Sequence, residues 1–183
     1  MADIEVAMGV IAAISRLGLP APSILWDIEA VHEAVRKDGR FKTFISVGLC
    51  SNVFSTWAAN ERSNRLVRID SADTIKVGSR IDADDDWTEF KEKAVGTAKY
   101  GLITRFFLSD GKSVMIIGGV TAEGSTMMSS FLSGNWQSLA ACRDPHTKSQ
   151  IGGCEFSAVL EARKGGVEVS DIRVRRGPAS DNQ

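Results

Sequence analysis

Residues 100–132, YGLITRFFLSDGKSVMIIGGVTAEGSTMMSSFL, decide the fold of this chain. Two β-rich runs, residues 102–108 and 114–117, flank the tetrapeptide Ser-Asp-Gly-Lys at positions 109–112, which is typical of a hairpin turn. We therefore expect the two runs to form antiparallel strands. The second run is apolar on both faces, a pattern typical of a central strand that helices cover on both sides.

A glycine-rich loop, residues 118–126 (GGVTAEGST), follows the second strand and leads into a predicted helix. Unpaired backbone N–H groups and the positive end of a helix dipole meet at such a turn, and together they favour an anion. The spacing is close to that of a P-loop, but Ser125 stands where that motif has its lysine, and Glu123 adds negative charge. The pattern therefore argues against a triphosphate with magnesium. The alternative interpretation is that the glycines only permit a tight turn and close packing.

A second turn of the same kind occurs earlier in the chain. Residues 41–49 (FKTFISVGL) predict a strand, and Gly48, Ser51 and Asn52 lie in the small polar turn before a short helix. If this strand is parallel to residues 114–117, both loops open at the same edge of the sheet, where α/β proteins bind their ligands. Ser51 and Asn52 also suit helix capping, which does not exclude contact with a ligand.

We therefore predict that a small anionic ligand, derived from a nucleotide or of similar chemistry, binds between the two loops. Tyr100 and Arg105 rank behind the loop residues, because alternate residues of their strand face away. The predicted ligand-binding residues are Gly48, Ser51, Asn52, Gly118, Gly119, Gly124, Ser125 and Thr126, followed by Tyr100 and Arg105.

Catalysis has few candidates in this sequence. The two histidines, His32 and His146, do not sit beside a nucleophile elbow, so serine hydrolase chemistry is disfavoured. Glu123 is the carboxylate placed to cleave a glycosidic bond of a nucleotide, and its alternative role is a favourable interaction with the helix dipole. The sequence thus favours a binding or sensing module without catalysis of its own. A nucleotide or NAD-type hydrolase that uses Glu123 is the alternative, and a scaffold or interaction subunit is the second alternative.

Composition narrows the class of protein. The 183 residues fit one domain, and 22 basic against 23 acidic residues offer no electrostatic case for binding nucleic acid or an anionic membrane. Three cysteines without C-x-x-C spacing are typical of reduced thiols in a cytoplasmic protein. We expect no cofactor.

The acidic run at residues 82–86 does not predict a metal site. As a calcium loop it would have Trp87 in place of the sixth-position glycine and Lys93 in place of the twelfth-position glutamate. Asp86 and Glu89 instead predict a capping box at the start of a helix over residues 87–95.

Two helices are predicted before the first strand. Residues 2–17 carry an apolar stripe that favours core packing, with a homo-oligomer or partner-protein contact as the alternative. This segment is too short to cross a bilayer. Ser23 is a plausible cap for a second helix that ends at residues 38–39. The stripe of the first helix comprises Ile4, Ala7, Met8, Ile11, Ile14 and Leu17.

Three motifs occur in succession and are followed by a closing hairpin at 155–175: G-x-x-S-N at 48–52, K-Y-G-L-I at 99–103 and G-G-x-x-x-x-G-S-T at 118–126. In this succession the chain resembles a group of uncharacterised bacterial Rossmann-like domains. Members of that group occur alone or beside modules of signalling and defence systems, so the resemblance implies a nucleotide-like ligand or a sensor role. The expected fold class is α/β, a three-layer Rossmann-like mixed sheet with flanking helices and antiparallel hairpins. An N-terminal helical pair (1–40) would pack on the α/β domain (41–176), and a disordered tail (177–183) would follow.

Overall fold

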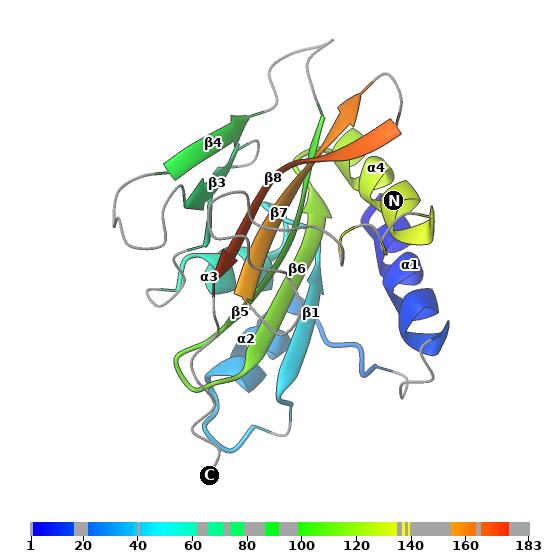
Figure 1. The fold of residues 1–183 in the computed structure, drawn as a ribbon. Helices are drawn as coiled ribbons and strands as arrows, with labels where there is room; N and C mark the ends of the chain where they lie inside the picture. The colour runs from blue at the N-terminus through cyan, green and yellow to red at the C-terminus, as the bar shows by residue number, and fades with distance from the viewer. Residues whose placement is uncertain are drawn as a thin grey trace.

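The hairpin predicted around residues 109–112 lies within a five-stranded mixed sheet in the computed structural model of the chain (Figure 1). The structure describes residues 2–16, 22–39, 41–61, 66–71, 74–78, 87–91, 99–134, 137, 139, 155–163 and 166–175. The helices of this part are α1 (Ala2–Arg16), α2 (Asp27–Val35), α3 (Val53–Ala59) and α4 (Ala122–Gly134). Its strands are β1 (Thr43–Val47), β2 (Val67–Ser71), β3 (Thr74–Gly78), β4 (Trp87–Lys91), β5 (Tyr100–Phe107), β6 (Ser113–Gly119), β7 (Glu155–Arg163) and β8 (Gly166–Arg175). None of the described helices is long and apolar enough to cross a membrane.

The large sheet has the order β1-β6-β5-β7-β8, and a smaller antiparallel sheet has the order β2-β3-β4. Strands β5 and β6 form the predicted antiparallel hairpin, and β7 and β8 form the closing one. Strand β1 is parallel to β6, with Ile45 opposite Met115. A mixed α/β fold is thereby confirmed. The Rossmann-like three-layer arrangement stays a prediction, because β1 and β6 are the one parallel pair among the described strands of the large sheet.

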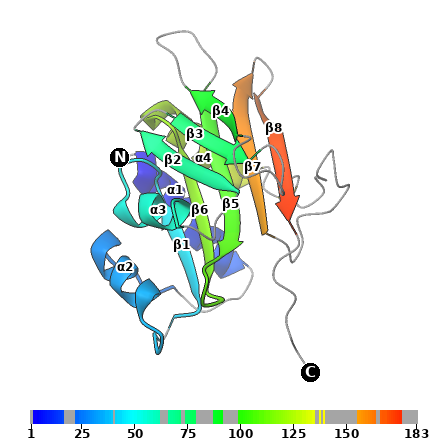
Figure 2. The ribbon, with the colours of Figure 1, turned by 90° about the vertical axis from the view of Figure 1, so that its left-hand side faces the viewer.

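Both faces of the large sheet are covered. Figures 1 and 2 show α1 and α4 on one face, and α2, α3 and the small sheet on the other. Successive residues of a strand point to opposite faces, so β6 places Ile116 in the core under α3 and Ile117 in the core under α4. This confirms the prediction of a strand buried on both sides.

The helix predicted over residues 87–95 is wrong for residues 87–91, and residues 92–95 lie outside the described residues. Residues 87–91 are strand β4, which pairs with β3 and places Glu89 opposite Lys76, whose charged groups lie 3.1 Å apart. Aromatic and β-branched side chains at positions 87, 88 and 90 favour a strand, and pairing with β3 prevails over the capping signal. The acidic run at 82–86, with its calcium-loop comparison, lies outside the described residues.

The second helix also begins later than predicted. Residues 22–26 are not helical, and α2 starts at Asp27, so Ser23 is not its cap. The carboxylate of Glu29 accepts the backbone N–H of Trp26 at 3.1 Å, which stabilises the helix start at this point. Ile24, before the helix, and Ile28, in its first turn, are 85% and 63% exposed.

Candidate ligand site

The glycine turns that follow β1 and β6 lie side by side, because these strands are parallel neighbours. The backbone N–H of Gly48 donates to the C=O of Ile117 at 2.9 Å. Gly48 has a φ of +99°, which glycine adopts without strain. A Cβ on Gly118 would lie 3.0 Å from the backbone of Gly48. The loops therefore meet at one edge of the sheet, as the sequence predicts, but they are packed against each other.

The second glycine loop is also closed on the helix that follows it. A Cβ on Gly119 would lie 1.9 Å from the backbone N of Ser125 and 2.0 Å from the backbone C of Gly124. Ser125 is only 3% exposed, and its Oγ accepts the N–H of Gly119 at 3.3 Å. Here the glycines serve close packing of the β6 turn against the first turn of α4.

A carboxylate of the chain itself lies where the sequence predicts an anionic ligand. The Oγ of Ser125 donates to Asp3 Oδ1 at 2.9 Å. The other carboxylate oxygen, Oδ2, lies 3.3 Å from the position that a Cβ on Gly48 would take. Helix α1 thus places its own acidic first turn over both loops, and the position near the positive end of α4 is filled.

Asn52 is a cap that joins three segments. Its Oδ1 accepts the N–H of Ser55 at 2.8 Å and the Oγ of Ser46 at 3.2 Å. Its Nδ2 donates to Asp27 Oδ1 and to the C=O of Val47, both at 3.1 Å. The side chain therefore has its donors and acceptor engaged. The capping interpretation of Asn52 is confirmed.

The side chains of the remaining predicted residues are exposed or contact other parts of the chain. Ser51 and Thr126 are exposed, and Thr126 Oγ1 donates to the C=O of Ala122 at 3.2 Å. Tyr100 packs edge-on against the Phe90 ring at 5.5 Å. The guanidinium of Arg105 lies over the ring of Phe107 at 5.4 Å, and its Nε donates to Ser113 Oγ at the start of β6, away from the loops.

Glu123, the candidate catalytic carboxylate, is exposed on the first turn of α4. A hydrogen bond from its own backbone N–H, one from Thr121 and the charge of Lys99 hold the pKa of Glu123 below its ordinary value. Thr121 Oγ1 donates to the carboxylate at 3.2 Å, and the Lys99 ammonium lies 3.9 Å away. The group is therefore an ionised surface carboxylate at neutral pH.

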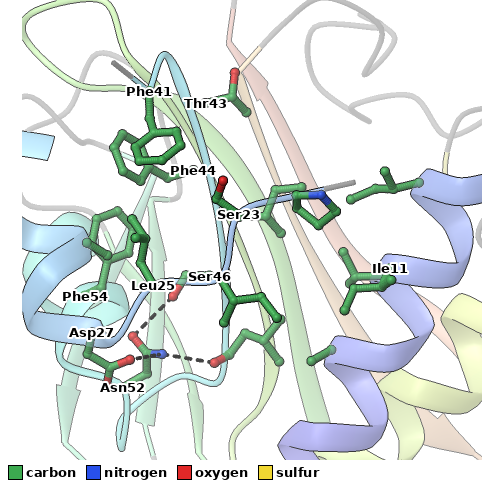
Figure 3. A pocket seen from close by; sticks show the side chains of 18 residues that line it. Ile11, Ser23, Leu25, Asp27, Phe41, Thr43, Phe44, Ser46, Asn52 and Phe54 are labelled. Carbon is green, nitrogen blue, oxygen red and sulfur yellow. Dashed lines mark hydrogen bonds between the residues drawn. The ribbon is translucent and has the colours of Figure 1, made fainter. Parts of the chain in front are cut away.

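A cavity of about 560 Å³ lies instead along β1, between α1 and the segment that leads into α2 (Figure 3). We call it the β1 cavity. All five residues of β1 line it, and apolar side chains form most of its walls. Its lining residues are Ala7, Val10, Ile11, Ile14, Pro22, Ser23, Ile24, Leu25, Asp27, Ala30, Phe41, Thr43, Phe44, Ile45, Ser46, Val47, Asn52 and Phe54.

The polar side chains at one end of the β1 cavity bind each other. Asp27 accepts from Asn52 through Oδ1 and from the N–H of Val53 through Oδ2, at 3.1 and 3.2 Å. Ser46 contacts the Oγ of Ser55 at 2.8 Å as well as Asn52. Figure 3 shows the bonds of Asn52 with Asp27 and with Ser46, below Leu25. Since these groups already have partners, this end of the cavity offers little free hydrogen-bonding capacity.

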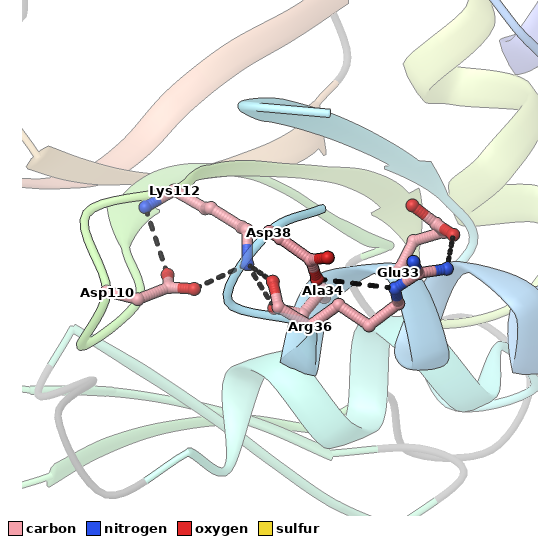
Figure 4. A network of polar contacts seen from close by, with 6 residues as sticks. All are labelled: Glu33, Ala34, Arg36, Asp38, Asp110 and Lys112. Carbon is pink, nitrogen blue, oxygen red and sulfur yellow. Dashed lines mark hydrogen bonds and ion pairs between the residues drawn. The ribbon is translucent and has the colours of Figure 1, made fainter. Parts of the chain in front are cut away.

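A buried lysine anchors α2, which supplies part of this cavity wall (Figure 4). Lys112, in the β5–β6 turn, is 2% exposed, and its Nζ donates to the C=O groups of Ala34 and Arg36 at 2.8 and 2.6 Å. The same ammonium is paired with Asp110. The last turn of α2 is thus capped by a residue 76 to 78 positions away.

Sequence reasoning missed this cavity because it assigned the α1 stripe to the core. Ile4 and Met8 of that stripe are 66% and 61% exposed, whereas Val6, which lies off the stripe, is fully buried. Ile11 and Ile14 are half-buried and line the cavity. Leu17 lies outside the described residues. The signal was therefore present as an amphipathic pattern, but a pattern does not say whether an apolar face packs on protein or borders a cavity.

Comparisons with protein-family models, with curated proteins and with solved structures gave no match. The resemblance to bacterial Rossmann-like domains stays a prediction.

Proposed function

We propose that the chain is a small-ligand binding module without catalysis of its own, and that it holds its ligand in the β1 cavity. The observation that supports this is the cavity itself, about 560 Å³ and lined mainly by apolar side chains. Ligand sites in proteins commonly measure about 300 to 1,000 Å³ and combine apolar walls with a few placed polar groups. The glycine loops are filled by Asp3 and by their own packing, so they offer no comparable space.

The chemistry of the walls favours an uncharged, mainly apolar ligand. Among the lining residues that the structure describes, Asp27 is the one charged side chain, and both of its oxygens already accept hydrogen bonds. An anionic ligand would be repelled by this carboxylate and would meet no lysine, arginine or histidine among the described residues of the lining. The anionic, nucleotide-derived ligand that the sequence suggests therefore fits this cavity less well than an apolar molecule.

The hydrolase alternative has less support. Glu123 is not among the residues that line the β1 cavity, and its lowered pKa opposes a role as general acid near neutral pH. The interaction-subunit alternative has a specific observation in its favour, because large apolar side chains are exposed on α1 and around the start of α2. Sedimentation of the wild-type protein and of Trp26→Ser tests it, since Trp26 is 81% exposed and a contact through it would be lost.

The binding proposal is tested with Nile red, an uncharged apolar dye. We expect saturable binding at one site per chain, with the folded state stabilised by about 2.7 kcal/mol at a hundredfold excess over the dissociation constant. Ala7→Trp fills the cavity and should weaken binding at least about tenfold. Met8→Trp is the matched control, because Met8 is the next residue on α1, is 61% exposed and does not line the cavity. Equal affinity of both variants, or no saturable binding by the wild type, would contradict the proposal.

A further inference from the structure

Strand β1 lies at an edge of the large sheet, and half of its peptide groups face away from the sheet. The C=O of Lys42 accepts the N–H of Ser113, and the N–H of Gly48 donates to the C=O of Ile117, both at 2.9 Å. Peptide groups alternate in direction along a strand, so the even-numbered positions between these two bonds face β6. The N–H and C=O groups of the odd-numbered positions, Ile45 at their centre, therefore point to the open side.

Ile45 keeps both of its backbone groups unpaired at this edge. The C=O of Val47 is taken by Asn52 Nδ2 at 3.1 Å. Within the part of the chain that the structure describes, the N–H and C=O of Ile45 have no partner. Ile45 is 41% exposed, and the whole of β1 lines the cavity. A donor and an acceptor from one residue thus face the cavity together.

This pair has the hydrogen-bonding pattern that one residue of an added strand satisfies. The walls on either side of the edge are apolar, with Ile11 of α1 on one side and the rings of Phe44 and Phe54 on the other (Figure 3). Successive side chains of an extended peptide point alternately to the two walls. Because both walls are apolar, the side chains that face either wall should be apolar too. The part of the lining that the structure describes holds no basic side chain for a free carboxylate.

We propose that the ligand of the β1 cavity is an extended, uncharged apolar peptide segment that adds to β1 as a short strand and exchanges both backbone hydrogen bonds with Ile45. This inference rests on the proposed function and specifies its ligand. The outward positions from Thr43 to Val47 span about 13 Å at roughly 3.3 Å per residue, enough for about three to five residues of peptide. The segment is internal to a longer chain or blocked at its ends.

The test uses the peptide acetyl-Thr-Val-Ile-Val-Thr-amide and the same peptide N-methylated at its central residue, titrated by calorimetry into the full chain. We expect one peptide per chain and at least about tenfold weaker binding of the N-methylated peptide, because it lacks the donor for the C=O of Ile45. Hydrogen exchange supplies a second measurement. The amide of Ile45 should exchange at least about tenfold more slowly when the unmethylated peptide is bound.

The matching protein variant is Ile45→Pro, with Ile45→Val as its control. Proline removes an N–H that faces away from β6, so the β1–β6 ladder keeps its hydrogen bonds. We expect Ile45→Pro to bind the peptide at least about tenfold more weakly than Ile45→Val does, because only proline removes the N–H that pairs with the peptide. If Ile45→Pro does not fold, the N-methylated peptide gives the same test on the unmodified protein.

The outcomes separate the two proposals. Equal affinity for both peptides, or unchanged exchange at Ile45, would overturn the peptide inference, and the binding module would stand if Nile red still binds. Failure of Nile red as well as of the peptide would overturn both. A dimer in sedimentation that Ile45→Pro dissociates would also overturn the inference, since the added strand would then come from a second copy of this chain.

Discussion

The glycine-loop edge and the β1 cavity lie next to each other, and they differ in what α1 brings to them. At the glycine loops α1 contributes Asp3, whose carboxylate binds Ser125 and covers Gly48. Along β1 the same helix contributes an apolar stripe that does not close on the strand, and a cavity of about 560 Å³ remains. Small residues beside a helix start are thus compatible with either a ligand or close packing. The neighbouring element decides between them.

The largest loss of stability is expected from Gly119→Ala, which places a methyl group between the closely packed backbone segments of the second glycine loop. The added Cβ would lie 1.9 Å from the backbone N of Ser125, and backbone atoms cannot move aside as a side chain can. We expect a loss of about 3 kcal/mol in the free energy of unfolding, measured in urea. Gly134→Ala is the control, because nothing lies within 4 Å of its Cβ position. An unchanged urea midpoint for Gly119→Ala would mean that the loops are not closed.

The second-largest loss of stability is expected from Lys112→Met, which removes the anchor of α2 in the wall of the β1 cavity. This change leaves the C=O groups of Ala34 and Arg36 without their buried donor, so we expect a loss of about 2 kcal/mol, measured by urea unfolding. Lys42→Met is the matched control, since the Lys42 side chain is exposed. Similar stability of the two variants would show that the ammonium does not anchor α2.

The polar contact that closes the glycine-loop edge is removed by Asp3→Ala. We expect a loss of about 1 kcal/mol, the usual size of one charge-assisted hydrogen bond at a partly exposed site. The double variant Asp3→Ala/Ser125→Ala should lose less stability than the sum of the two single losses, because the two residues share one contact. Strictly additive losses in thermal unfolding would argue that Asp3 and Ser125 act independently.

A smaller, pH-dependent effect is expected at Asp110. Desolvation alone would raise the pKa of Asp110, but the hydrogen bonds and charge of Lys112 outweigh it and lower the pKa below its ordinary value of 3.8. The contribution of Asp110 to stability is therefore present above about pH 4 and is lost as the pH falls through the folded-state pKa. Asp110→Asn should cost about 0.5 kcal/mol at pH 7, and this cost should shrink as the pH falls below about 4 in thermal unfolding. A cost that does not shrink with falling pH would contradict this origin.

The smallest effect is expected from Glu123→Gln. Its carboxylate is exposed and lies outside the β1 cavity, so the urea midpoint and the affinity for Nile red should both match the wild type. A change in Nile red affinity would extend the functional surface to the first turn of α4 and weaken the contrast between the two regions.

The sequence identifies many of the candidate residues one by one, but it does not predict how they are arranged in space. The sequence correctly places Gly48 and Gly118 at one edge, because a parallel pair of strands puts the following turns side by side. It also identifies Asn52 as a cap. It misses strand β4, because the Asp86 and Glu89 capping pattern is local, whereas the pairing with β3 that overrides it is not.

The sequence by itself determined the hairpins β5–β6 and β7–β8 and the burial of β6 on both faces, because turn chemistry and alternating patterns act over a few neighbouring residues. Only the tertiary structure decided that Asp3 reaches Ser125, 122 positions away, and fills the predicted anion position. It likewise decided that Ile45 faces a cavity at the edge of the sheet. Both outcomes depend on how α1 packs against distant elements, and side-chain polarity alone does not encode that packing.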